Sequence, residues 1–174
     1  LSSIETSDII PIDLNVLLYH TEKSMASFFG NSGDFQKRDF YQQRASQRFH
    51  AIQQYCYCKE DKIYYDHHWK NKNLTKKFTA ASFFPFWLDA VPPENIIQCG
   101  KAVAEKTKEE LLRDGGILTT TVTNNQQWDA PNGWAPLQWI SIAAMEKSGQ
   151  AELAEEIARR WLKLNEEVFS RTGK

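Results

Sequence analysis

Apolar residues recur at three- and four-residue steps along most of this chain, a spacing that predicts amphipathic helices. The first helix is predicted from Asp8 to Phe29, with Pro11 at its first helical position and Asp13 in its first turn. A second is predicted from Asp34, as its cap, to about Cys56. The stripes expected to be buried are Leu14, Leu17, Leu18, Thr21, Met25 and Phe28 in the first helix, and Tyr41, Ala45, Phe49, Ile52 and Cys56 in the second.

The middle of the chain predicts two further helices of opposite character. The segment from Phe78 to Ala90 is apolar on almost every side, so it is expected to be buried on every side. Pro85 should kink or break it near Phe84. The next helix is predicted from Glu94 to about Arg113, with a charged face in solvent and a glycine pair, 115–116, ending it.

Two helices are predicted near the end of the chain, from Pro136 to about Lys147 and from Ala151 to Phe169. A short extended piece at 63–66, with a hairpin closing at 71–73, is the only strand expected. The six helices should pair as antiparallel hairpins: first with second, third with fourth, fifth with sixth. Residues 1–174 are then a single helical domain, and the periodicity fits a bundle, a solenoid or a toroid.

The stretch from Gly115 to Trp139 has no helical period in its first part and a distinctive composition. It holds three of the six tryptophans and, between residues 124 and 132, five amide side chains with the carboxylate of Asp129. A sugar ring offers apolar C–H faces that stack on an indole, and hydroxyls that pair with amides and carboxylates. The stretch therefore predicts a carbohydrate-binding loop, although Trp128 and Trp134 could instead pack the loop against a helix.

Charge and composition exclude several classes of function. With 21 basic and 22 acidic side chains, nucleic acid and anionic membranes are disfavoured as partners. No apolar run approaches the ~20 residues of a membrane span. Leu1 opens directly into polar sequence, so no signal peptide is predicted, and the compartment stays open. The three cysteines, at positions 56, 58 and 99, favour neither a disulfide framework nor a metal site. The adjacent His67 and His68 would face opposite ways in a strand and are expected to be surface or stacking residues.

Residues 127–136, Gln-Trp-Asp-Ala-Pro-Asn-Gly-Trp-Ala-Pro, match every fixed position of the pattern Q-W-D-x-P-x-(small)-W-(P/A/S)-P. The chain thereby resembles the trehalase family of glycoside hydrolases. Residues 10–15, Ile-Pro-Ile-Asp-Leu-Asn, resemble the family's V-P-V-D-L-N segment. Residues 115–118 resemble its P-G-G-(I/L) segment, with Asp114 where proline is usual. The order and spacing of these segments fit along essentially the whole chain.

The resemblance implies an all-α fold in which paired antiparallel helices form about half of an (α/α)6 toroid, with the sugar site at one mouth. It implies hydrolysis of the disaccharide α,α-trehalose to two glucose molecules with inversion, and no cofactor or metal. Inversion requires one carboxylic acid to protonate the bridging oxygen and a second carboxylate to activate water on the opposite face.

The two catalytic segments of the family are not found in this chain. The family's acid lies in an S-G-W-D segment and its base in a G-G-G-G-E-Y segment, and neither occurs here. The chain thus looks like an internal fragment from the C-terminal half of such an enzyme, with no catalytic residue and no activity expected of it alone. The expected substrate-binding residues are Gln127, Trp128, Asp129 and Trp134.

Other interpretations stay open at this point. Asp129 lines the sugar site, ties down the loop through backbone N–H groups, or acts as a catalytic carboxylate. The chain offers no convincing partner for the catalytic role, because helix capping accounts for Glu5, Asp8 and Asp13. The parent could be another (α/α)6 glycosidase, or the chain could be a non-catalytic module that binds sugar or protein. Half of a ring would also expose apolar surface, so the isolated chain is expected to self-associate.

Overall fold

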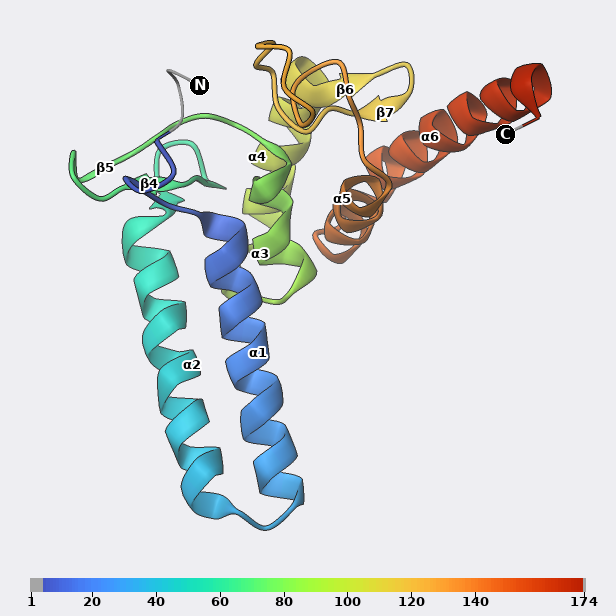
Figure 1. Cartoon of the computed structure of the whole chain (residues 1–174). Helices are drawn as coiled ribbons and strands as arrows, with labels where there is room; N and C mark the ends of the chain where they lie inside the picture. Colours follow the sequence, from blue (N-terminus) through green and yellow to red (C-terminus); the bar gives the residue numbers. More distant parts are fainter. Residues whose placement is uncertain (1–4, 174) are drawn as a thin grey trace.

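The computed structural model describes residues 5–173, which fold mainly as helices. Helices α1 (Ile12–Asn31) and α2 (Phe35–Tyr55) form a long antiparallel hairpin that projects from the rest of the molecule (Figure 1). The side chain of Asp34 accepts a hydrogen bond from the Lys37 N–H at 3.1 Å, which confirms the predicted cap of α2. Its predicted face is confirmed as well, because Ala45, Ile52 and Cys56 are buried.

Helix α1 departs from its prediction in start and in orientation. It begins after Pro11, because Ile9 and Ile10 (β1) pair instead with His67 and His68 (β4). The predicted stripe is wrong: Leu14, Leu17, Leu18 and Phe28 are exposed, whereas Ile12, Val16, Tyr19 and Glu22 are buried. Apolar residues lie on two sides of this helix, and the buried side carries a charged residue, so hydrophobicity alone selects the wrong side.

Short antiparallel strands connect the helices. One sheet has the order β1–β4–β5, where β5 is Asn73–Leu74. A hairpin therefore closes near residues 71–73 as predicted, but its first arm is β4 and not the predicted extended piece at 63–66. A second pair joins β2 (Tyr57–Cys58) to β3 (Ile63–Tyr64). A third joins β6 (Leu112–Arg113) to β7 (Gly116–Ile117). Residues 115–116 therefore lie at a hairpin rather than at the end of a helix, which corrects that prediction.

The predicted third helix is present only as a short, broken segment. A 3-10 turn, η1 (Ala80–Phe83), leads directly into α3 (Phe84–Trp87), with Pro85 in the first turn of α3. The break near Phe84 and the burial on every side are both confirmed, since Phe83 and Phe86 are fully buried. The fourth helix is shorter than expected: after η2 (Pro93–Asn95), α4 (Ile96–Lys106) passes into a π-helical turn, η3 (Thr107–Leu111).

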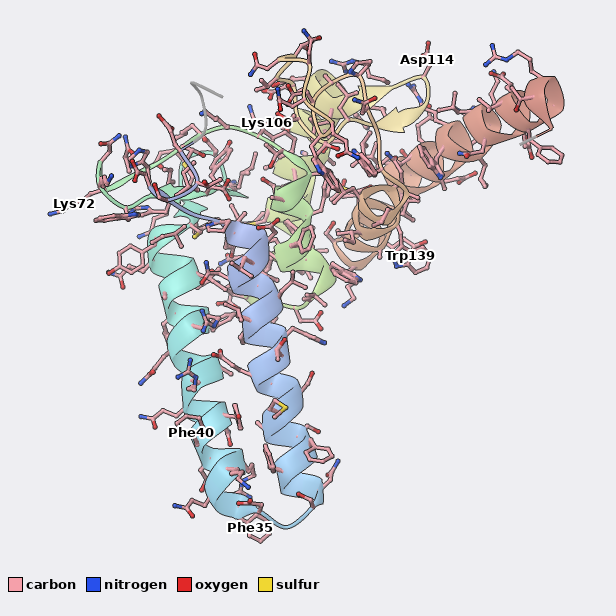
Figure 2. All side chains as sticks on the ribbon, in the orientation of Figure 1. Phe35, Phe40, Lys72, Lys106, Asp114 and Trp139 are labelled. Atoms are coloured by element: carbon pink, nitrogen blue, oxygen red, sulfur yellow. The ribbon has the colours of Figure 1, made fainter. Side chains whose placement is uncertain are left out.

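Helices α5 (Ala135–Lys147) and α6 (Ala151–Thr172) form the last antiparallel hairpin, and the C-terminal half of α6 extends beyond its neighbours (Figure 1). Helices α1, α3 and α5 pack against one another, with α3 between the other two. The fold is all-α, and its paired helices make about half of an (α/α)6 toroid with α1, α3 and α5 as the inner helices. In Figure 2, Trp139 points outward from α5. Within residues 5–173, no helix has both the length and the apolar character needed to span a membrane.

Candidate functional site

A cavity of about 440 Å³ lies where the inner helices begin. Pro11 and Asp13 line it from the start of α1, Ala80 from the start of η1, and Leu137 from the first turn of α5. The loop that precedes α5 contributes Trp128 and further polar side chains. The volume is within the range of small-ligand sites, and the convergence of chain segments far apart in sequence is typical of them.

Backbone contacts hold these segments together at the cavity. The Ala80 N–H donates to the Thr119 carbonyl at 2.9 Å, and Thr79 pairs with Thr120 in an isolated antiparallel bridge. The Thr79 hydroxyl caps η1 by accepting from the Ala81 N–H at 3.3 Å. The polar wall of the cavity is therefore attached to the buried segment of η1 and α3, which gives it a rigid support.

The two tryptophans of the Gln127–Pro136 segment lie against each other. The rings of Trp128 and Trp134 are stacked, with centroids 4.3 Å apart and planes inclined by 24°. Trp128 lines the cavity and is 52% exposed, so one face of its indole is open to a ligand. Trp134 is partly buried, and its ring N–H has no partner among the described residues. Trp128 therefore lines the cavity, and Trp134 stacks against it from outside the cavity wall.

Asp129 organises the loop and also lines the cavity. Its Oδ2 accepts from the backbone N–H of Asn124 at 2.6 Å and of Gln126 at 3.3 Å. Gln127 is exposed, and its backbone carbonyl accepts from the side chain of Asn132 at 3.3 Å. Of the four residues predicted to bind substrate, the cavity wall brings together Trp128 and Asp129; Gln127 and Trp134 lie beside it.

Two further carboxylates line the cavity that the sequence did not place there. Asp66 Oδ1 accepts from the Ile12 N–H at 2.9 Å and so caps α1 from a segment 54 residues away. Burial raises the pKa of Asp66, and this hydrogen bond partly opposes the rise. Asp13 Oδ1 accepts from the Leu14 N–H at 2.7 Å, in keeping with its predicted capping role. Asp13 belongs to the Ile10–Asn15 segment, which is the one sequence signal that could have suggested it.

Other chemically notable side chains make ordinary structural contacts. His67 packs edge-on against Tyr55, with ring centroids 5.5 Å apart, and His68 accepts from the Asn71 N–H at 3.3 Å. Burial raises the pKa of the Cys56 thiol to about 12, so it is a poor nucleophile. In the described part of the chain, no group of three or more His, Cys, Asp or Glu side chains is placed to hold a metal ion.

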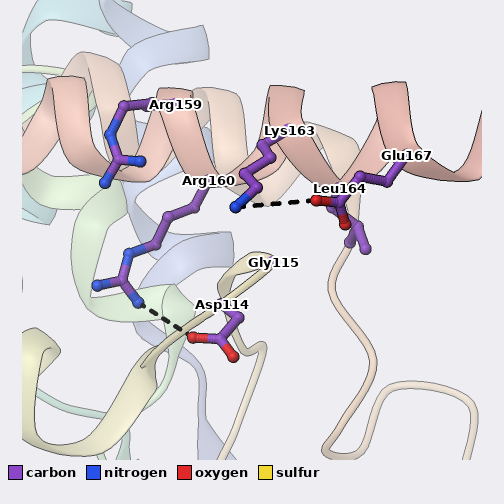
Figure 3. A pocket seen from close by; sticks show the side chains of 7 residues that line it. All are labelled: Asp114, Gly115, Arg159, Arg160, Lys163, Leu164 and Glu167. Carbon is purple, nitrogen blue, oxygen red and sulfur yellow. Dashed lines mark ion pairs between the residues drawn. The ribbon is translucent and has the colours of Figure 1, made fainter.

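A second hollow of about 360 Å³ lies between the β6–β7 turn and α6 (Figure 3). It is lined by cations, but acidic neighbours compensate them: Arg160 lies 4.0 Å from Asp114, and Lys163 lies 3.8 Å from Glu167. No aromatic side chain lines this hollow. The cavity at the inner helix starts is therefore the better candidate for binding an uncharged, ring-shaped ligand.

Comparison with known proteins gives matches over the whole chain. The family model described as Trehalase matches residues 1–174. The periplasmic trehalase of Salmonella paratyphi B is 37% identical over 174 residues, which are 100% of this chain and 30% of that protein. The periplasmic trehalase of Salmonella dublin shows the same identity and coverage. The chain thus spans about 30% of the length of the curated relatives it matches.

Solved structures show a similar fold. The neutral trehalase of Saccharomyces cerevisiae superimposes with a TM-score of 0.79 at 24% identity, over 95% of this chain and 33% of that one. A mannosylglycerate hydrolase from Thermus thermophilus, in complex with Tris, superimposes with a TM-score of 0.67 at 15% identity, over 91% of this chain and 38% of that one. These structural similarities concern the fold alone, and they support the half toroid.

Proposed function

Because this chain belongs to the trehalase family, we propose that it supplies part of the sugar-site wall of an inverting glycosidase that hydrolyses α,α-trehalose to two glucose molecules. One observation carries the proposal: Trp128 and Asp129 of the matched segment line a cavity of about 440 Å³ at the starts of the inner helices. An open indole face beside carboxylates suits a sugar ring, which presents both apolar C–H faces and hydroxyls.

In this proposal the chain binds and orients sugar and does not carry out the bond cleavage. Inversion needs an acid and a base roughly 6.5–9.5 Å apart on opposite faces of the scissile bond, with water between. The cavity carboxylates of Asp13, Asp66 and Asp129 are each hydrogen-bonded to backbone N–H groups, which suits positioning groups. We assign the acid and the base to segments of the parent enzyme that contain the S-G-W-D and G-G-G-G-E-Y patterns.

Binding of trehalose to the purified chain tests the sugar-site proposal. Titration followed by calorimetry and by tryptophan fluorescence should give saturable binding that Trp128→Phe weakens. Trp139→Phe is the matched control, because Trp139 is also exposed but lies on α5 outside the cavity wall. Equal loss in both variants, or no saturable binding by the unmodified chain, would contradict the proposal.

Release of glucose tests the division of labour between this chain and the rest of the enzyme. The purified chain should release no glucose from trehalose, because it lacks both catalytic segments. Sustained turnover that Asp129→Asn abolishes would show that the acid or base lies within these residues and would overturn the assignment.

A different (α/α)6 glycosidase is the second candidate function, since the mannosylglycerate hydrolase shares this fold. Competition among trehalose, maltose and mannosylglycerate for the same site separates the two. Preference for trehalose supports the first candidate, and preference for another glycoside supports the second. Calorimetry with an iminosugar also distinguishes a glycosidase wall from a module that binds protein. As an isolated half ring, the chain should in addition self-associate through its exposed apolar residues.

A further inference from the structure

Asn132 and Gly133 form the one asparagine–glycine step of the chain, because every other asparagine is followed by a residue with a side chain. Both residues are exposed, and they lie in the loop between β7 and α5, outside any helix or strand. At such a step the backbone attacks the asparagine amide most readily, because glycine has no Cβ to obstruct the approach and rotates freely. The loop therefore contains a candidate site of covalent modification.

The two groups that would react are weakly held. In the described part of the chain, the Gly133 N–H has no hydrogen-bond partner, so its nitrogen is available as the nucleophile. The Asn132 side-chain nitrogen, which is the leaving group, donates to the Gln127 carbonyl at 3.3 Å, slightly longer than a typical N–H···O bond. Asn125 in the same loop differs, because Gln126 follows it and the Gln126 N–H donates to a carboxylate at 3.3 Å.

The reaction needs only water and a base. The backbone nitrogen of Gly133 loses its proton to the base and bonds to Cγ of Asn132, while the bond from Cγ to Nδ2 breaks and Nδ2 leaves as ammonia with a proton from solvent. Water then opens the resulting succinimide ring at one of its two carbonyls. Opening at Cγ gives aspartate, and opening at the main-chain carbonyl gives isoaspartate. In sum, one amide and one water give one carboxylic acid and one ammonia.

The backbone at Gly133 has little room for a change of length. A Cβ at this position would lie 3.1 Å from the Ile117 carbonyl oxygen and 3.1 Å from Gln138 Nε2. These two atoms hold each other, since Gln138 Nε2 donates to the Ile117 carbonyl at 2.7 Å. Isoaspartate adds one carbon to the backbone directly before Gly133, and close-packed surroundings respond to a single methylene group. The longer backbone therefore presses on the contact that joins α5 to β7.

We propose that Asn132 deamidates spontaneously in the folded chain, and that its isoaspartate product loosens the contact between the loop, β7 and α5. A newly made chain has a neutral side chain and a backbone of normal length at this step, whereas an aged chain has a carboxylate and a longer backbone. The aspartate product changes only the charge, at an exposed position. The inference does not rest on the proposed function, because it concerns the loop itself and not its ligand.

Incorporation of oxygen from water is the first test. The folded chain is incubated below its Tm in water enriched in heavy oxygen, at mildly acidic and at mildly alkaline pH, and its peptides are weighed by mass spectrometry. The label should enter at Asn132, several-fold faster at alkaline pH because base removes the Gly133 proton. Asn125 is the internal control and should be labelled at least several-fold more slowly. A synthetic peptide of residues 127–136 is the positive control: if the peptide is labelled and the folded chain is not, the inference is overturned.

The structural consequence is tested on aged protein. Asn132→Asp carries the charge without the longer backbone, and Asn132→Gln keeps an amide that cyclises far more slowly. Aged unmodified chain, with its isoaspartate measured by enzymatic methylation, should have a lower Tm than Asn132→Asp, whereas aged Asn132→Gln should keep the Tm of fresh protein. Hydrogen exchange at the Ile117 N–H, which donates to Gln138 at 2.9 Å, should be several-fold faster in the aged chain.

The outcomes separate the two parts of the inference. If aspartate is the only product, or if chain rich in isoaspartate matches Asn132→Asp in both Tm and Ile117 exchange, the proposed loosening of α5 and β7 is wrong. If Asn132 and Asn125 are labelled equally, the asparagine–glycine step is not a special site. Trehalose enters none of these measurements, so failure here leaves the proposed function standing, and failure of the proposed function leaves this inference standing.

Discussion

Glu22 is the most unusual residue of the α1–α2 hairpin, because it is charged and yet only 6% exposed. Its Oε1 lies 2.8 Å from Arg48 Nη2, and its Oε2 accepts from Arg48 Nε at 2.9 Å. Arg44 approaches the same carboxylate at 3.3 Å. Removing the carboxylate from such a group leaves the two arginines without their counter-ion. The stability of the α1–α2 hairpin should therefore depend on this contact.

The first prediction is that Glu22→Gln lowers the free energy of unfolding by about 1.5–3 kcal/mol, the usual range for hydrogen bonds to charged groups. Urea denaturation at neutral pH measures it. Glu105→Gln, at an exposed position on α4 without a partner in the described residues, should be close to neutral. Equal effects of the two substitutions would show that the Glu22 contact does not stabilise the fold.

The same residue gives a prediction on pH. The hydrogen bond from Arg48 lowers the pKa of Glu22 from its ordinary value of 4.5. A carboxylate with a lowered folded-state pKa stabilises the fold fully above its unfolded-state pKa, and loses this contribution as pH falls through the lower folded value. The stability difference between the unmodified chain and Glu22→Gln should therefore be constant near neutral pH and shrink below about pH 4.5. A difference that grows on acidification would contradict this.

At the scale of single residues, the sequence predicts site residues that stand together in one motif. It does not predict site residues that come from distant segments and meet only in the folded chain. Trp128 and Asp129 could be predicted because they stand side by side in a constrained segment. Asp66 could not, because its contact is with Ile12, 54 residues earlier, and a single aspartate after a short strand has no distinctive pattern. The positions of Gln127 and Trp134 beside the cavity depend on how the loop folds, which composition does not determine.

At the scale of elements, the β6–β7 hairpin depends on Gly116. Its φ is +106°, and a Cβ at this position would lie 2.4 Å from Gln138 Oε1. Gln138 is buried, accepts from the Ile117 N–H at 2.9 Å and donates to the Ile117 carbonyl at 2.7 Å. The Gln138 side chain of α5 thus binds the edge of the β6–β7 hairpin at Ile117. A side chain at position 116 would displace Gln138 from these contacts.

We predict that Gly116→Ala destabilises the chain by more than Gly33→Ala does. Both positions have positive φ, but a Cβ at Gly33 would have no neighbour within 4 Å. Gly33→Ala therefore measures the backbone cost alone, about 1–3 kcal/mol for a non-glycine residue in such a conformation. Gly116→Ala should add the loss of both Gln138 contacts. Thermal unfolding measures the difference, and equal effects would show that Gln138 does not hold the hairpin.

The helices were predicted correctly where the spacing of apolar residues and the residues typical of helix ends indicated the same boundary. The prediction was wrong where these two signals disagreed or were ambiguous. For α2 and α5 the predicted ends lie within one or two residues of the observed ones, because the cap residue Asp34 and Pro136 in the first turn are clear signals of where a helix begins. The glycine pair 115–116 is equally compatible with a helix end and a hairpin, and tertiary contact with Gln138 decides between them. In α1 both sides offer apolar residues, so only packing against α2 and α3 selects the buried one.

At the scale of the whole molecule, the helix count and the motif together predicted the half ring, whereas periodicity alone did not. Helices that pair can form a bundle, a solenoid or a toroid, and the resemblance carried by residues 127–136 made the choice. The two ends of the arrangement are the α1–α2 hairpin and the α5–α6 hairpin, with α3 packed between α1 and α5. Each end presents a helix side that has no further inner helix against it in the described part of the chain.

The exposed apolar residues of α6 lead to the last prediction, that the isolated chain self-associates through this end of the half ring. Leu162 on α6 is 61% exposed, and Phe169 in the protruding half of the helix is 64% exposed. Leu162→Ser should shift sedimentation velocity profiles towards the monomer at a given concentration, because it removes apolar area that association buries. Ile97→Ser is the matched control, since Ile97 is 60% exposed but lies on α4, between the two ends. If both substitutions favour the monomer equally, association is a general property of exposed apolar residues here; if neither does, the open end is not an interface between copies.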